Sequence, residues 1–155
     1  MQLDQICSSG FVNDNLKAKN KTEALQELVN TIIQGGLKLD SSVVIEVLQQ
    51  REKLGSTGIG DGVAIPHGKI PGLEELVVAF GRSKEGIPFD AVDGKPVHLF
   101  FLLLAPENSS GQHLKALAKI SKMLKAANFR KKLLEAKSRG DLYKLIIDQD
   151  ETCQV

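Results

Sequence analysis

Apolar and polar residues along this chain follow two periods, one typical of helices and one typical of strands. Between residues 24 and 33 the apolar side chains recur every three or four positions, which predicts a helix that runs to about Gln34. Asn20 and Glu23 stand at its start with the spacing of a capping box, in which side chains satisfy free N–H groups of the first turn. The first clearly bounded element is therefore expected to be a helix.

A second helix is expected to begin after Asp40, a favourable N-cap residue, and to end near Leu54, because Gly55 follows. Its apolar stripe is Val43, Val44, Val47 and Leu48. Three further helices are predicted near the end of the chain. The first has a buried stripe of Leu114, Leu117, Ile120, Met123 and Leu124, the next spans 128–135 with Phe129, Leu133 and Leu134 inward, and the last spans 141–148. Beyond it, residues 149–155 are expected to be frayed.

The strand-like segments differ in strength. Residues 97–105 form an almost continuous apolar run, which predicts a central strand covered by helices on both faces. Residues 76–81 predict a second strand, and 11–18 and 63–66 predict weaker ones. Residues 82–94 contain several turn formers and predict a connection. Because strands and helices alternate without a strict β–α–β rhythm, we expect an α/β fold whose mixed sheet carries helices on both faces.

Composition and charge are those of an ordinary soluble globular protein. The 155 residues are 42% hydrophobic and 25% charged, which suits one domain covering residues 1–155. The formal net charge of +1 indicates no general attraction to nucleic acid or to a membrane surface. No apolar run approaches the roughly 18 residues that span a bilayer, and the N-terminus lacks the pattern of a signal peptide. We therefore expect a cytoplasmic protein that binds neither nucleic acid nor membrane.

The two cysteines and one of the histidines carry no clear chemistry. Cys7 and Cys153 lie near opposite ends of the chain in no metal-ligand spacing, which indicates reduced thiols, although a disulfide between them stays open. His98 lies inside the predicted central strand, and its sequence separation from the other histidines fits no zinc pattern. We interpret His98 as structural, and we expect no metal and no cofactor.

Candidate chemistry concentrates in the stretch REKLGSTGIGDGVAIPHGK, which begins at Arg51. Its loop holds Gly55, Gly58, Gly60 and Gly62. Glycines allow positive φ angles and close approach, and successive N–H groups in such a loop can bind an anion. His67 follows a proline and supplies a nucleophilic imidazole, while Gly68 leaves room for a partner to dock over that ring. These residues raise the hypothesis of a histidine that becomes phosphorylated, with Arg51 as a positive group for the phosphate. From the residues alone, a structural histidine is the more common case, and Arg51 could simply stabilise the end of its helix.

The same stretch matches neither a Walker A loop nor G-x-G-x-x-G, so a nucleotide site is not indicated. It closely resembles the active-site signature of the EIIA domains of the bacterial phosphotransferase system, of the fructose/mannitol type. The matching parts are Arg51-Glu52, the run 55–60, and Ala-Ile-Pro-His-Gly at 64–68. Residues 86–91 and 113–118 also resemble the family, so the likeness covers nearly the whole chain. Within the family, the nitrogen-regulatory branch is the most similar.

The resemblance implies a three-layer α/β/α sandwich and a phosphoryl carrier that needs no cofactor. In the family, the histidine that matches His67 receives a phosphoryl group from the phosphohistidine of the carrier protein HPr or of its paralogue NPr. Arg51 and His113 are then expected to lie beside the phosphate. The glycine-rich loop is expected to contribute as a phosphate-binding loop, made of Gly55, Ser56, Thr57, Gly58 and Gly60.

Alternatives stay open on the sequence alone. The favoured role is a regulatory EIIA whose phosphorylation state biases other proteins, and the alternative is a sugar-specific component that passes phosphate to an EIIB domain. His113 could instead be an exposed residue at a helix start, and Glu52 is expected to be solvated. Ser56 and Thr57 could donate hydrogen bonds to the phosphate, or they could serve merely to cap the loop. Weaker hypotheses are an interaction module without transfer and a hydrolase using Ser56 or Ser109, for which no nucleophile elbow is present.

Overall fold

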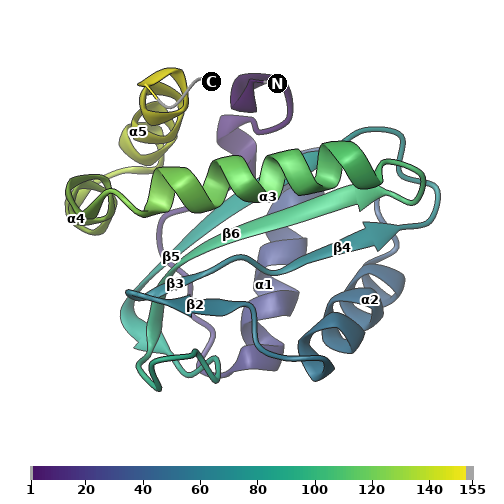
Figure 1. The fold of residues 1–155 in the computed structure, drawn as a ribbon, viewed down its shortest axis with the longest axis horizontal. Helices are drawn as coiled ribbons and strands as arrows, with labels where there is room; N and C mark the ends of the chain where they lie inside the picture. Colours follow the sequence, from purple (N-terminus) through teal and green to yellow (C-terminus); the bar gives the residue numbers. More distant parts are fainter. Residues whose placement is uncertain (1, 153–155) are drawn as a thin grey trace.

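A mixed sheet forms the middle layer of the molecule (Figure 1). The computed structural model describes residues 2–152. The strands are β1 (Val12–Asn13), β2 (Gly58–Gly60), β3 (Val63–Ala64), β4 (His67–Ile70), β5 (Val77–Ile87) and β6 (Val97–Pro106). Their order is β1–β5–β6–β3–β2, and β4 pairs with β6 beyond β3. β5 is antiparallel to β6, whereas β3 and β4 are parallel to it, so the sheet is mixed, as expected.

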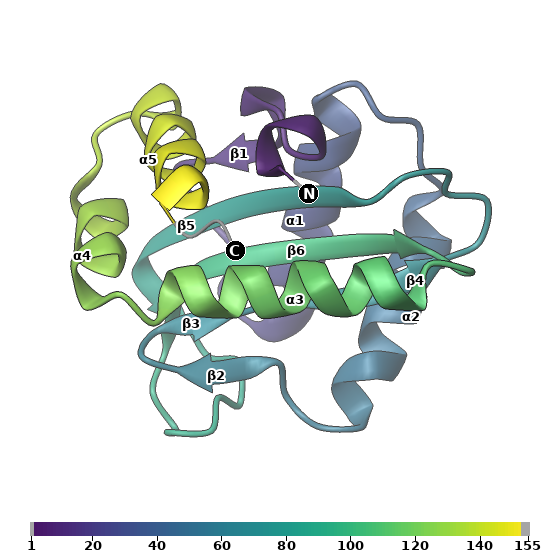
Figure 2. The same cartoon turned by 45° about the horizontal axis from the view of Figure 1, so that its top comes forward.

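Helices cover both faces of this sheet (Figure 2). The α-helices are α1 (Lys21–Gln34), α2 (Ser41–Lys53), α3 (Ser110–Leu124), α4 (Ala127–Glu135) and α5 (Arg139–Thr152), and two short 3-10 helices are η1 (Leu3–Gln5) and η2 (Ser9–Phe11). The buried side chains form two clusters. One joins the sheet to α1 and α2, and the other joins the opposite face to α3, α4, α5 and η1. The three-layer α/β/α sandwich expected from the sequence is confirmed.

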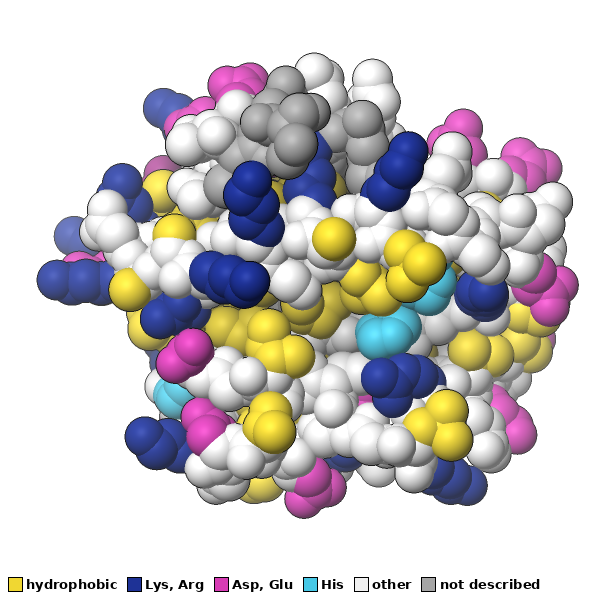
Figure 3. Space-filling model, in the orientation of Figure 1, with side chains coloured by type: hydrophobic (Ala, Val, Ile, Leu, Met, Phe, Trp, Pro, Cys, Tyr) yellow, Lys and Arg dark blue, Asp and Glu magenta, His cyan; other side chains and the backbone are white. Residues whose placement is uncertain are grey.

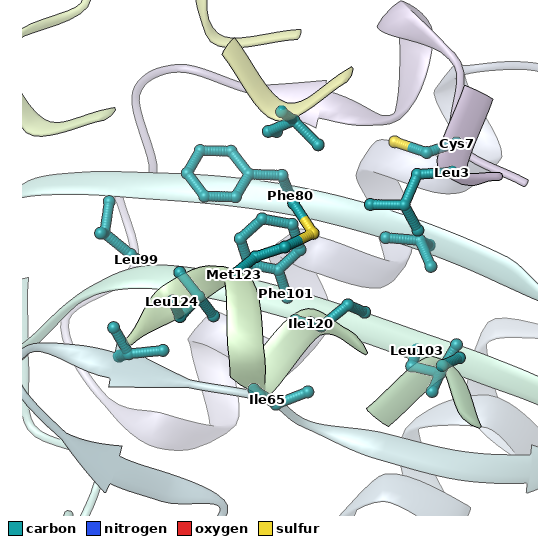
Figure 4. Packing of buried hydrophobic residues seen from close by; sticks show 14 of the residues in the cluster. Leu3, Cys7, Ile65, Phe80, Leu99, Phe101, Leu103, Ile120, Met123 and Leu124 are labelled. Atoms are coloured by element: carbon teal, nitrogen blue, oxygen red, sulfur yellow. The ribbon is translucent and has the colours of Figure 1, made fainter. Parts of the chain in front are cut away.

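β6 is buried on both faces, as its continuous apolar run predicts. The side chains that face α3 are Leu99, Phe101, Leu103 and Ala105, and those that face α1 and α2 are Phe100, Leu102 and Leu104. Figure 4 shows the α3 side of this packing, with Phe101 and Leu103 near Ile120. Truncating a buried leucine to alanine costs about 2–5 kcal/mol. Because so many of its side chains are buried, displacing β6 would be costly, and it gives the strands that pair with it a rigid support.

Both predicted N-caps are present. The amide of Glu23 donates to the side-chain oxygen of Asn20 at 2.9 Å, and the Glu23 carboxylate accepts from the amide of Lys19 at 3.0 Å. At the start of α2, the Asp40 carboxylate accepts from the amide of Ser42 at 3.2 Å. These caps fix where α1 and α2 begin, and α2 is the helix that carries Arg51 in its last turn.

Three of the strand predictions were wrong in extent, and one of them, 63–66, ends already at Ala64. Of residues 11–18, only Val12–Asn13 form a strand, which pairs parallel with β5. Residues 82–87, expected in a connection, continue β5 to Ile87. The pairing with β6 is irregular between Arg82 and Ile87, and this irregularity breaks the alternation by which strands are predicted.

Arg82 is one reason why the sequence pattern does not predict the second half of β5 as a strand. Its side chain is 1% exposed, although arginine is rarely buried. The guanidinium donates to the carbonyl oxygens of Asp14 at 3.2 Å and Leu133 at 3.0 Å, and also to that of Ala136. These bonds satisfy the buried charge and join β5 to the end of α4 and to the N-terminal segment.

The C-terminal helix is longer than predicted, since α5 spans Arg139–Thr152 rather than 141–148. Asp150 explains the extension. Its carboxylate is buried, accepts from the amide of Leu3 at 2.8 Å and pairs with Lys119 of α3 at 2.5 Å. Residues 149–152 are therefore helical instead of frayed, while 153–155 lie outside the described residues. Three residues expected to be buried are exposed: Val43, Leu114 and Leu134.

The remaining predictions concern the two cysteines, His98 and membrane-spanning helices. Cys7 is buried, and this burial raises the pKa of its thiol to about 12. Cys153 lies outside the described residues, so the possible disulfide between the two cysteines remains untested. His98 is half-buried in β6, with Nδ1 2.9 Å from the carbonyl oxygen of Ser83, which agrees with a structural role. Across residues 2–152, none of the helices combines the length and the apolar content that crossing a membrane requires.

Candidate functional site

His67 is the first residue of β4, directly after Pro66. The carbonyl oxygen of Pro66 accepts a hydrogen bond of 2.9 Å from the amide of Leu103, and His67 itself is in register with Leu103. The rigid strand β6 therefore fixes the backbone that carries the imidazole. The ring itself is half-buried at the surface of the sheet layer, where another molecule can reach it.

The hydrogen bonds of His67 determine which ring nitrogen carries the proton. Nδ1 lies 2.8 Å from the carbonyl oxygen of Ile65. Because a carbonyl oxygen can only accept, Nδ1 must donate, and the neutral ring then has its free electron pair on Nε2. That atom accepts from Nε of Arg51 at 3.3 Å. Nε2 is thus the ring nitrogen whose electron pair is not taken up by a proton.

Arg51 lies in the last turn of α2 and connects two parts of the site. While its Nε donates to His67, its Nη1 donates to the carbonyl oxygen of Gly55 at 2.9 Å. The planar guanidinium is held by both bonds, so a fixed positive charge lies beside Nε2 of His67.

His113 lies in the first turn of α3 and is 8% exposed, so the alternative of an exposed polar residue is wrong. Its ring packs edge-on against that of His67, with the centroids 5.3 Å apart at an interplanar angle of 75°. Its Nε2 atom is buried and has no hydrogen-bond partner within residues 2–152. A buried polar atom without a partner is costly, and a ligand that forms a hydrogen bond with it would remove the cost.

The surroundings keep both imidazoles neutral near pH 7. Burial lowers the pKa of His67 below its ordinary 6.5, and the nearby charge of Arg51 lowers it further, against the opposing effect of the bond to Ile65. Burial also lowers the pKa of His113, and His67 and Lys69 add to this effect. A neutral His67 retains the electron pair on Nε2 that a nucleophile needs.

The predicted phosphate-binding loop begins beside this histidine pair, but much of its polarity is already used within the protein. The hydroxyl of Ser56 donates to the carbonyl oxygen of Phe89 at 2.6 Å, and the amide of Gly58 donates to the Ser56 hydroxyl at 3.0 Å. The amide and hydroxyl of Thr57 donate to the carboxylate of Glu52 at 3.1 and 2.5 Å. Direct binding of phosphate by Gly55, Ser56, Thr57, Gly58 and Gly60 stays a prediction.

Two expectations about individual residues of this stretch were wrong. Glu52 was expected to be solvated, but it is 9% exposed and accepts both bonds from Thr57. Gly68 was expected to leave room for a docking partner, but it faces inward: a Cβ there would lie 2.7 Å from Cγ1 of Val47. The absence of a side chain at Gly68 therefore lets α2 pack closely on β4, which places Arg51 near His67.

The hydroxyl groups proposed for the weaker hydrolase hypothesis do not contact a histidine. Ser56 donates to the carbonyl oxygen of Phe89, and Ser109 donates to that of Pro106 at 2.7 Å. Both are bonded to backbone, so neither is activated as a nucleophile in this arrangement.

The surface around the histidines carries exposed hydrophobic side chains. Leu54, beside Gly55, is 85% exposed, and Leu114, beside His113, is 67% exposed. Figure 3 shows histidine side chains at the surface next to basic side chains, with hydrophobic side chains on either side. Exposed apolar groups around reactive ones are typical of a surface on which another protein docks.

The comparison with known families agrees with the geometry. Residues 5–149 match the family model described as "Phosphoenolpyruvate-dependent sugar phosphotransferase system, EIIA 2". The chain belongs to this EIIA family. The family resemblance stated from the signature around His67 is confirmed, and the domain is a phosphotransferase-system EIIA domain.

Individual relatives of this EIIA domain come from two branches. A nitrogen regulatory protein of Bradyrhizobium diazoefficiens is 45% identical over 94% of this chain and 95% of its own length. A fructose-specific EIIABC component of Bacillus subtilis is 34% identical over 97% of this chain, which corresponds to only 24% of that longer protein. Among solved structures, the nitrogen regulatory protein IIA-Ntr of Neisseria meningitidis is 36% identical, with a TM-score of 0.85 over 92% of this chain and 97% of that one.

Proposed function

We propose that this EIIA domain carries a phosphoryl group on Nε2 of His67 and receives it from the phosphohistidine of HPr or NPr. The hydrogen bond of 2.8 Å between Nδ1 and the Ile65 carbonyl oxygen is the observation that supports this most directly. It holds the proton on Nδ1 and leaves the electron pair of Nε2 available to attack phosphorus. The proposed exchange takes place in the cytoplasm, between residues 1–155 acting as one domain and the carrier.

In the proposed step, the N–P bond of the donor phosphohistidine breaks as a new bond forms between phosphorus and Nε2 of His67. The electron pair of the broken bond returns to the donor imidazole, and no water enters the step. His67 keeps its proton on Nδ1, where the carbonyl oxygen of Ile65 stabilises the positive charge that the ring gains. Binding and electrostatic stabilisation, rather than proton transfer, are therefore the main contributions of the protein.

Two side chains are available for the oxygens of the transferred group. Arg51 gives up its 3.3 Å contact with Nε2 when phosphorus approaches and then faces the phosphoryl oxygens. His113, whose ring packs edge-on against the same imidazole, has an Nε2 atom without a hydrogen-bond partner in the described residues. Both are held in place before the reaction, as preorganised electrostatic stabilisation requires.

We infer that the phosphorylated state has a regulatory role. The relative named nitrogen regulatory protein is 45% identical and matches over nearly its full length, whereas the fructose-specific relative is 34% identical. Phosphorylation adds up to about two negative charges. These charges would lie beside exposed Leu54 and Leu114, so a target protein that docks there can distinguish the two states.

A second candidate function comes from the name of the Bacillus subtilis relative, a fructose-specific EIIABC component. In this case His67 would pass its phosphoryl group to the EIIB part of a sugar transport system. The two candidates share the first transfer and differ only in whether the phosphoryl group then moves to a second protein.

Donor-dependent phosphorylation tests the shared step. The purified protein is incubated with phosphorylated HPr and, separately, with phosphorylated NPr, and its intact mass is followed. We expect an acid-labile gain of about 80 Da, one phosphoryl group, located on His67. Replacing His113 with alanine should slow the gain more than replacing its exposed neighbour Gln112. Absence of any gain with either donor would favour an interaction module without transfer.

A second experiment separates the two candidates. The phosphorylated protein is mixed with a fructose-specific EIIB domain and the loss of its phosphoryl group is measured. Loss to EIIB at a rate comparable with the first transfer would establish the sugar-specific role. Retention of the group, together with state-dependent binding of another protein, would establish the regulatory one.

A further inference from the structure

Glu52 is a buried carboxylate that the proposed transfer does not use. It comes directly after Arg51 in the last turn of α2 and bonds to the loop, and its charge partly opposes the lowering of the His67 pKa. Its two oxygens accept from the amide and the hydroxyl of Thr57 at 3.1 and 2.5 Å. A carboxylate loses its hydration when it is buried, so Glu52 depends on these bonded partners for its charge to be stabilised.

Lys21, the first residue of α1, neutralises this carboxylate. Its Nζ lies 3.0 Å from Glu52, 3.8 Å from Asp90 and 4.8 Å above the centre of the Phe89 ring. Its side chain is 23% exposed. Glu52, at the end of α2, therefore connects the loop that follows this helix to the start of α1, about 30 residues earlier in the sequence.

The same loop is held from its other side by residues 89–92. The Ser56 hydroxyl donates to the carbonyl oxygen of Phe89 at 2.6 Å, and the amide of Val92 donates to the carbonyl oxygen of Gly58 at 3.1 Å. A Cβ on Gly58 would approach Ala91 to 2.9 Å, so the two backbones are in close contact. Residues 56–58 are thus fixed between Glu52 and the segment 89–92.

The fixed loop determines where Arg51 lies. Gly55 directly precedes residues 56–58, and its carbonyl oxygen accepts from Nη1 of Arg51 at 2.9 Å. The same guanidinium places its Nε 3.3 Å from Nε2 of His67. Because the guanidinium is planar and rigid, a shift of the Gly55 carbonyl shifts the nitrogen that faces His67.

We propose that Glu52 and Thr57, with Lys21 as counter-charge, are positioning residues that hold Arg51 against Nε2 of His67 through the carbonyl of Gly55. They contact neither the phosphoryl group nor the imidazole. This inference rests on the proposed phosphoryl transfer and adds to it a network that sets the rate of transfer.

Thr57→Val is the sharpest variant, because it removes one hydroxyl without changing charge or shape. Phosphoryl transfer from phosphorylated HPr should slow about ten-fold with the KM for the donor unchanged, since small misplacements of a positioned group cost up to ~100-fold. Thr57→Ser restores the hydroxyl and should restore the rate. The matched control is Thr31→Val, which also removes a buried threonine hydroxyl, one that donates to the carbonyl oxygen of Glu27 away from the site.

The charge on Glu52 is tested by a parallel pair of variants. Glu52→Gln should slow transfer as Thr57→Val does, with KM again unchanged. Glu27→Gln is its control, because the Glu27 carboxylate also accepts from loop amides, those of Lys17 and Ala18. Thermal unfolding of all four variants shows whether each pair loses comparable stability. This pair still decides the proposal if Thr57→Val does not fold.

A measurement without any donor examines the positioning directly. The Nε–H group of Arg51 gives its own signal in ¹H–¹⁵N spectra, and its bond to His67 slows exchange of that proton with water. We expect faster exchange in Thr57→Val and Glu52→Gln, and no change in Thr31→Val and Glu27→Gln. If the wild type takes up no phosphoryl group, the proposed function fails, and this signal still decides the positioning. Unchanged exchange in Thr57→Val and Glu52→Gln would overturn the positioning role. Equal slowing of transfer in these variants and in their controls would overturn it too.

Discussion

The Nδ1 atom of His67 lies 2.8 Å from the carbonyl oxygen of Ile65, two residues earlier in the chain. This contact is local, so it forms whenever the turn between β3 and β4 forms. It determines that Nε2 is the nitrogen with the free electron pair, and β4 turns that nitrogen toward Arg51. One backbone carbonyl thus sets the tautomer on which the proposed transfer depends.

Replacing His67 with alanine should abolish phosphorylation by HPr and NPr. The side chain is half-buried and its loss removes no core packing, so the free energy of unfolding should change by less than about 1 kcal/mol. Intact-mass spectrometry and urea unfolding measure the two effects. His98→Ala is the control and should be labelled normally. Labelling of the His67→Ala variant on another histidine would show that the nucleophile has been misassigned.

Replacing Arg51 with alanine should slow the transfer without blocking it. Loss of one preorganised donor to a developing charge costs about 100-fold in rate. Rapid-quench measurement of transfer from phosphorylated HPr gives the rate. Lys53→Ala removes an exposed positive charge from the same last turn of α2 and should leave the rate within two-fold, or about 0.4 kcal/mol. Equal rates for the Arg51 variant and the wild type would remove this residue from the site.

The imidazole of His67 should titrate below the ordinary value of 6.5. Burial disfavours its charged form and the Arg51 guanidinium adds to this, so the lowered pKa keeps the ring neutral as the pH falls toward 6.5. Phosphoryl acceptance should then persist to lower pH than for an exposed histidine and be lost as the pH falls through the folded-state pKa. ¹H–¹⁵N spectra of the ring measure this value directly. In Arg51→Ala the pKa should rise, and a fall or no change would contradict the assigned cause.

Substituting Gly68 with alanine should disturb the site through packing. The added Cβ would lie 2.7 Å from Cγ1 of Val47, which forces α2 away from β4. Overpacking of this kind costs about 1–3 kcal/mol. Urea unfolding should show this loss, and a second substitution, Val47→Ala, should recover part of it. Gly111→Ala is the control: its new Cβ meets no atom of another part of the fold within 4 Å and α3 favours alanine, so it should not destabilise the protein.

Much of the fold could be predicted because its strongest patterns are local. The apolar run of β6 and the caps Asn20 and Asp40 act through neighbouring residues, and the structure contains each where the sequence places it. Arg82 and Asp150 show the limit of such reasoning. Their burial depends on carbonyl groups and an amide far away in the chain, and no local period reports those partners.

The same contrast between local patterns and distant partners applies to the candidate site. The sequence identifies His67, Arg51 and His113, and the structure brings the three together. The burial of Glu52 was missed, because a glutamate in the last turn of a helix is usually solvated. The available signal was the signature itself, in which Glu52 comes directly after Arg51 and precedes the loop of Thr57. Only the folded chain shows that the carboxylate and this loop are bonded.

The central claim is that phosphorus bonds to Nε2 of His67. Protein labelled with ¹⁵N in its histidine rings is phosphorylated by the donor and kept at alkaline pH, and the coupling between ³¹P and ¹⁵N is recorded. We predict coupling to Nε2 of His67, with Nδ1 still protonated and bonded to the Ile65 carbonyl oxygen. Coupling to Nδ1, or to a ring of another histidine, would contradict the account.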